Sequence, residues 1–165
     1  MITEKQFNQQ KFLTKGIIEA TEEKPFYMAP NGGADVPHPD PLLREKIRDL
    51  VFNERDKYEA ENQSKISIEK FIADQCDIPY DTFKKYIGNN MKYNISRTFI
   101  AKIAVGLKLE IPEANKLFRM HSGELNVTNC FDYIVYHALR TEDEIDDFKK
   151  ELRKYAGIDL DKNHS

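Results

Sequence analysis

Several residue types that would give this chain an obvious identity are scarce or missing. It has no tryptophan and only two cysteines among its 165 residues. Cys76 and Cys130 lie far apart in sequence, without the close spacing that a zinc site or a redox pair needs, so we expect both to be reduced and buried. No apolar run approaches the roughly 18 residues of a membrane span, and no signal-like segment opens the chain. The sequence therefore predicts a cytoplasmic protein.

Motifs that carry catalysis are also missing. The sequence contains no glycine-rich phosphate loop, no nucleophile elbow and no paired carboxylates of the catalytic kind. The histidines have no partner at metal-ligand spacing, and they are His38, His121, His137 and His164. We therefore expect a protein that is not an enzyme and that needs neither a metal nor a cofactor.

Proline is concentrated in one stretch near the amino end. Five of the seven prolines lie within residues 25–41, together with two adjacent glycines, so residues 24–40 are predicted to be irregular chain. Before this stretch, residues 3–20 have an amphipathic pattern, and Thr3 and Gln6 have the spacing of a capping box. We expect residues 1–40 to form an arm with one short helix that is peripheral to the fold.

Beyond residue 40, apolar residues recur at helical spacing and no segment alternates long enough to form a strand, which predicts an all-α protein. Residues 41–123 are predicted to form one domain, and residues 124–165 a helical extension packed on it. The expected helices begin at Pro41, after Ser67, at Tyr80, after Ser96, at Pro112, after Thr128 and at Glu142, the last ending before Gly157.

Residues 67–87 have the steric pattern of a helix-turn-helix. In this motif two short helices cross closely, and the second lies in the major groove of DNA. Ala73 supplies a small residue for the crossing, and Asp77 is one of the few non-glycine residues that tolerate a left-handed turn. The apolar side chains of Ile78, Phe83 and Tyr86 are then spaced to lock the second helix against the first.

The polar residues of the second helix and of the chain after it are the candidate DNA contacts, because they can bond base edges and phosphates. They are Tyr80, Asp81, Thr82, Lys84, Lys85, Asn89, Asn90, Lys92 and Arg97. Residues 62–123 also hold ten Lys and Arg against six Asp and Glu, whereas both flanking parts are acidic. Alternatively, Lys84 and Lys85 form a solvated helix face, Tyr80 packs against the preceding helix, and Lys92 and Arg97 neutralise nearby acids.

Residues 67–117 resemble the lambda-repressor-like, Cro-type helix-turn-helix family, also called the xenobiotic-response-element family. The resemblance rests on the run Ile78-Pro79-Tyr80-Asp81-Thr82-Phe83, on Tyr86-Ile87-Gly88-Asn89 and on residues 96–107. Residues 111–117 and 129–157 are similar to a two-helix extension found in one bacterial branch of these proteins.

The resemblance implies that the helix starting at Tyr80 reads double-stranded DNA and that the amino end of the Ser96 helix binds phosphate. Two positions depart from the family pattern. Glu69 stands where members often carry a phosphate-binding glutamine, and Asp77 stands where the turn glycine is usual. The sequence thus leaves two functions open. The first is a homodimeric DNA-binding transcriptional regulator, of a phage or another mobile element. The alternative is a protein-interaction module, an inhibitor or adaptor whose acidic ends bind a basic partner.

Overall fold

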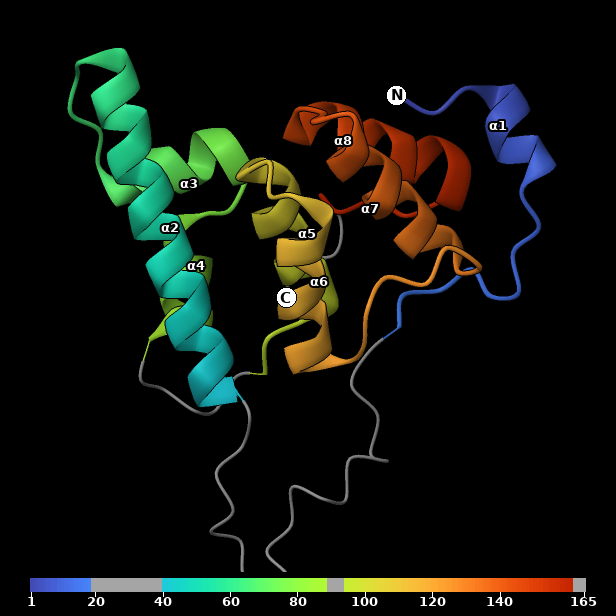
Figure 1. Cartoon of the computed structure of the whole chain (residues 1–165), viewed down its shortest axis with the longest axis horizontal. Helices are drawn as coiled ribbons and strands as arrows, with labels where there is room; N and C mark the ends of the chain where they lie inside the picture. The colour runs from blue at the N-terminus through green and yellow to red at the C-terminus, as the bar shows by residue number, and fades with distance from the viewer. Residues whose placement is uncertain (19–39, 89–93, 162–165) are drawn as a thin grey trace, which may run out of the picture.

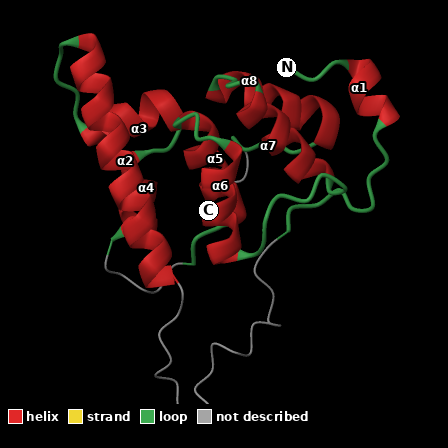
Figure 2. Ribbon diagram, viewed as in Figure 1, coloured by secondary structure: helices red, strands yellow, loops and turns green. Residues whose placement is uncertain are grey.

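A computed structural model describes residues 1–18, 40–88 and 94–161 of the chain. In this part of the protein the regular elements are helices and no strand is present, which confirms the all-α class (Figure 1 and Figure 2). In chain order they are α1 (Glu4–Gln9), α2 (Asp40–Asn62), α3 (Ile68–Cys76), α4 (Tyr80–Ile87), α5 (Arg97–Gly106), α6 (Ile111–His121), α7 (Cys130–Arg140), α8 (Ile145–Glu151) and a π-helical turn η2 (Leu152–Ala156).

Polar side chains cap the starts of α1, α3, α5 and α7, and in the first three of these helices the cap is the residue that the sequence predicts. Thr3 and Gln6 form the expected capping box of α1. The hydroxyl groups of Ser67 and Ser96 accept hydrogen bonds from backbone N–H groups in the first turns of α3 and α5. The expectation that Thr128 caps α7 is wrong by one residue. The Asn129 side chain accepts from the first turn instead, while the Thr128 hydroxyl donates to Asn126, 2.7 Å away.

Helix α5 lies at the centre of the molecule and connects its two sides. Its buried residues pack against α3 and α6 on one side and against α7 and α8 on the other (Figure 1). The apolar residues that α5 buries are Phe99, Ile100, Ala101, Ile103, Ala104 and Val105. One continuous apolar core results, and it extends from α2 to the carboxyl-terminal helices.

The longest helix, α2, runs along the edge of this core. Its first half buries Leu43, Ile47 and Val51, whereas further along Tyr58 is half-buried against the ring of Phe71. The end of α2 extends past the rest of the bundle (Figure 1). Among the residues that the structure describes, no helix is both long enough and apolar enough to cross a membrane.

The close helix contact in this region involves Gly106 and not Ala73. Ala73 is exposed, so the expectation that it forms the close crossing between two helices is wrong. At Gly106, the last residue of α5, an added Cβ would lie 2.5 Å from Cys76 Sγ and 2.5 Å from the carbonyl oxygen of Gln75. The close approach is therefore between α3 and α5, and glycine makes it possible.

The amino-terminal segment is part of the core, which corrects the expectation that it is peripheral. Helix α1 has only six residues, because the chain after Gln10 becomes extended and its backbone pairs with residues 128–130. Ile2 is buried, and the rings of Phe7 and Phe12 pack on Tyr133 of α7. Figure 1 shows this segment beside α7. The physical reason is the apolar area of its aromatic residues, which α7 and η2 help to bury.

The last helix starts later than its acidic residues suggest. Glu142 has a positive φ of 52°, and Glu144 is the N-cap residue of α8. Helix α8 then changes into the π-helical turn η2, which ends at Gly157 with φ 67°, as the glycine predicts.

Candidate nucleic-acid interface

Helices α3 and α4 are joined by a three-residue connection, residues 77–79. Asp77 adopts the predicted left-handed conformation, with φ 55° and ψ 44°. Its N–H donates to the Ala73 carbonyl at 3.1 Å, and the N–H of Ile78 donates to the Ile72 carbonyl at 3.3 Å. These two bonds satisfy carbonyl groups at the end of α3, and the buried side chain of Ile78 fixes the turn to the core.

Two lysines from other helices bind Asp77 and explain why an aspartate stands at this turn. Its carboxylate lies 2.6 Å from Lys149 Nζ of α8 and 3.8 Å from Lys102 Nζ of α5. Lys102 also donates to the Asp77 carbonyl at 3.0 Å. Burial lowers the pKa of Lys102. At Lys149 burial acts in the same direction, but the hydrogen bonds to Asp161 and Asp77, together with the charges of these two carboxylates, raise the pKa. A glycine would fit the backbone but would leave these ammonium groups without this carboxylate.

The inward side of α4 fixes the helix to the core. Phe83, Tyr86 and Ile87 are buried, and the Tyr86 ring lies 4.9 Å from the Phe99 ring of α5. Arg48 of α2 donates a hydrogen bond to the Ile87 carbonyl at the end of α4. Helix α4 is therefore held by three neighbouring helices, although it has only eight residues.

The outward side of α4 brings together the predicted contacts that lie on this helix. Asp81 is 98% exposed and Lys84 is 58% exposed, and their charged atoms lie 3.8 Å apart. Tyr80 is half-buried and stacks on Phe83, with its ring 4.9 Å from Lys84 Nζ. Thr82 and Lys85 are half-buried. One part of the Tyr80 side chain therefore packs on Phe83, and another part remains accessible to solvent. The other predicted contacts on the chain after α4, Asn89, Asn90 and Lys92, lie outside the described residues.

Arg97 does not belong to this surface, so the expectation that it contacts a phosphate is wrong. Its guanidinium group is fully buried and bonds both carboxylate oxygens of Asp132 on α7, at 3.2 and 2.8 Å. It also donates to the Ser122 hydroxyl at 2.6 Å and to the Gly123 carbonyl at 2.8 Å. Arg97 therefore joins α5 to α7. One feature of the sequence indicates this pair: Asp132 is an acidic residue within the apolar run that forms α7, so a buried cation is expected beside it.

The remaining candidate chemical groups are structural. Cys76 and Cys130 are both buried and not disulfide-bonded, and burial raises the pKa of the Cys76 thiol to about 12. His121 is buried, and its ring nitrogens contact the Ile95 carbonyl and the Ser122 hydroxyl. His137 packs beside Tyr133. Within residues 1–18, 40–88 and 94–161, no group of three or more His, Cys, Asp or Glu side chains is placed to hold a metal ion.

Compared with protein-family models, with curated proteins and with solved structures, the chain matches none of them. The features of this chain that bear on its function are therefore the α3–α4 pair and the residues that α4 exposes.

Proposed function

We propose that the protein is a sequence-specific DNA-binding transcriptional regulator and that α4 is its recognition helix. In this proposal α2 to α6 form a lambda-repressor-like domain, with α3 and α4 as the helix-turn-helix. The observation that carries it is the division of α4 into two sides. Three buried residues fix the helix to the core, while a polar side with Asp81 and Lys84 is left in solvent. A short helix held rigidly with its polar side outward suits the major groove.

Charge supports the same surface. Lys84 and Lys85 lie in the last turn of α4. Lysines at these places can neutralise phosphates on either side of the groove, which is the largest contribution to affinity for duplex DNA. Arg97 is buried in the core and cannot reach a phosphate, so in this proposal the phosphate contacts are made by these lysines. A homodimer on a two-fold site fits this mode of binding, since one such domain covers only one half-site.

The experiment is a salt titration of the full-length chain on random-sequence duplex DNA, followed by selection of preferred sites. If the proposal is right, affinity falls steeply as salt rises, because phosphate contacts release counterions. Replacing Lys84 and Lys85 together by alanine should abolish specific binding, while circular dichroism shows that the variant is still folded. The matched control replaces Lys57 and Lys150, which are exposed on α2 and α8. That control removes the same charge and should keep specific binding.

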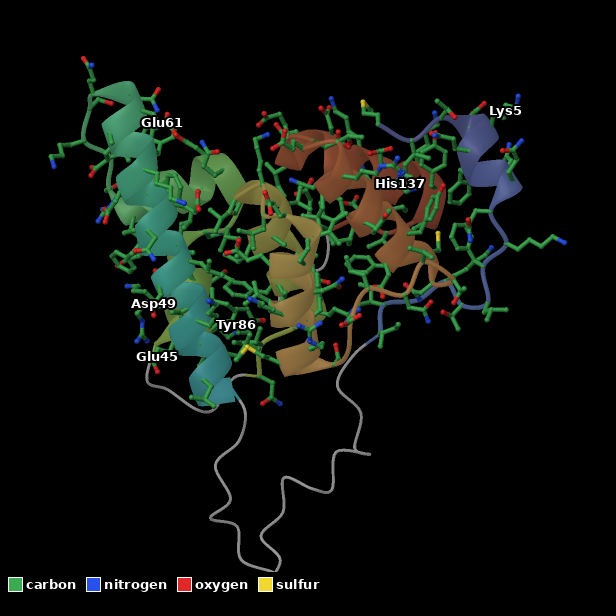
Figure 3. All side chains as sticks on the ribbon, viewed as in Figure 1. Lys5, Glu45, Asp49, Glu61, Tyr86 and His137 are labelled. Carbon is green, nitrogen blue, oxygen red and sulfur yellow. The ribbon has the colours of Figure 1, made fainter. Side chains whose placement is uncertain are left out.

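A second candidate is the protein-interaction module, and the surface of α2 favours it. Glu45, Asp49 and Glu61 are exposed along this helix (Figure 3), and Glu69 is exposed at the start of α3. These acids would repel DNA and attract a basic protein surface. If the salt titration finds no binding to any duplex, this candidate becomes the better one.

A further inference from the structure

Asp81 and Lys84 form a charged pair on the most exposed part of α4. The carboxylate oxygen and the ammonium nitrogen lie 3.8 Å apart, one turn from each other on the helix. The ring of Tyr80 lies 4.9 Å from the same ammonium group, so Lys84 is held between a carboxylate and an aromatic ring. A hydrogen-bond acceptor and a donor are thus presented side by side, in a fixed order along the helix.

The exposed carboxylate is unexpected on a helix that faces DNA. A phosphate group repels it, and no other residue of α4 is acidic. The amino-terminal residues of a recognition helix contact base edges, however, and Asp81 is the second residue of α4. Among the base edges in the major groove, the amino group of cytosine is the donor that Asp and Glu accept from.

The neighbouring ammonium group makes the match more specific. In a G·C pair, guanine presents two acceptors, N7 and O6, next to the N4 amino group of cytosine. O6 and N4 are hydrogen-bonded to each other, so they lie about 2.9 Å apart, compared with 3.8 Å between the charged atoms of Asp81 and Lys84. In an A·T pair the two acceptors are separated by the adenine amino group, and the thymine methyl group lies beside O4. An ammonium group is better matched by the adjacent acceptors of guanine.

We propose that Asp81 and Lys84 together read one G·C base pair in each half-site. Lys84 donates to guanine N7 and O6, and Asp81 accepts from cytosine N4. This inference rests on the proposed DNA-binding function, and it assigns to the ion pair a role in specificity that a solvated helix surface would not have.

The experiment is selection of bound sequences from a library of random duplex DNA, with three full-length proteins. They are the wild type, Asp81→Asn and the control Asp74→Asn. Asp74 of α3 is also exposed and also paired with a lysine, Lys70 at 3.0 Å, so the control removes the same charge from a similar ion pair outside α4. Both substitutions are at exposed positions, and equal melting temperatures of the three proteins establish that all are folded.

We expect the wild type and Asp74→Asn to select the same G·C pair at one position of each half-site. Asp81→Asn should lose this preference and shift toward A·T, because an amide pairs with adenine N6 and N7. On the wild-type site its affinity should fall about tenfold, the size of one base contact. If Asp81→Asn selects the same pair with unchanged affinity, the inference is wrong while DNA binding stands. If the wild type binds no duplex at any salt concentration, the proposed function fails and this inference fails with it.

Discussion

Gly106 shows how one residue sets the distance between two helices. It lies at the end of α5 against α3, where a Cβ would come within 2.5 Å of Cys76 Sγ and of the Gln75 carbonyl. Alanine normally favours a helix over glycine by about 1 kcal/mol. Here the overlap with backbone atoms outweighs that gain, and overpacking of this kind costs about 1–3 kcal/mol.

We therefore predict that Gly106→Ala lowers the free energy of unfolding by about 1–3 kcal/mol in urea denaturation. The control is Ala73→Leu, which should change stability by less than about 0.5 kcal/mol because Ala73 is exposed. An alanine variant at position 106 as stable as the wild type would mean that α3 and α5 can separate without loss.

Glu151, which binds the amino-terminal segment, makes the stability of the protein depend on pH. Its carboxylate accepts the N–H of Ile2 at 2.7 Å and lies next to the carboxylate of Asp143. Burial, together with Asp143, raises the pKa of Glu151 to about 7 from its ordinary value of 4.5, although the bond from Ile2 acts in the opposite direction. The folded protein therefore binds this proton more tightly than the unfolded chain does.

The sign of the effect follows from this difference. The stability that the proton contributes is complete below about pH 4.5 and is lost as pH rises through about 7. We predict that raising the pH from 5 to 8 destabilises the wild type relative to Glu151→Gln by roughly 2 kcal/mol. Glutamine keeps an oxygen for the Ile2 N–H and does not titrate. Melting temperatures measured across this range test the prediction, and parallel curves for the two proteins would contradict it.

At the level of helices and segments, local signals in the sequence were sufficient for most of the bundle. Apolar spacing predicts the helices after residue 40. Ser67 and Ser96 mark the starts of two helices and Gly157 marks the end of the last one, because caps and periodicity act over a few residues. Contacts between distant segments were not predictable in this way. The position of Arg97 beside the recognition helix suggests a phosphate contact, whereas its bonds to Asp132, 35 positions away, and to Ser122 and Gly123 explain its burial. The polar side of α4 was predictable because it depends on helical spacing alone.

The amino-terminal segment is the element for which sequence reasoning failed most clearly. The proline-rich stretch suggested an independent arm, yet Phe7 and Phe12 pack on Tyr133, and Asn129 donates to the Thr14 hydroxyl at 2.8 Å. We predict that a chain beginning at residue 40 is less stable than the full chain by several kcal/mol, because it exposes the apolar surface of α7 to water. Circular dichroism melting tests this. A truncated protein with the melting temperature of the full chain would show that the segment contributes nothing.

At the scale of the whole molecule, the buried Arg97–Asp132 pair connects the part proposed to bind DNA with the carboxyl-terminal helices. The two side chains of the pair have no exposed area. The guanidinium group also bonds Ser122 and Gly123, in the connection between α6 and α7. Asp132 in addition accepts the N–H of Asn126 at 2.9 Å. The pair therefore holds α5, α7 and the connection between α6 and α7 in one arrangement, and the two parts should unfold together.

Replacing one partner tests this coupling. Asp132→Ala leaves the Arg97 charge buried without its carboxylate, a change that typically costs about 3–5 kcal/mol. The double variant Arg97→Met, Asp132→Leu removes both charges and should recover most of the stability lost in Asp132→Ala. We predict a single cooperative transition in the wild type, followed equally by circular dichroism and by hydrogen exchange in α3 and α7. Two separate transitions in the wild type would contradict it, because α7 and α8 would then be an independent unit and Arg97 would stabilise only a local contact.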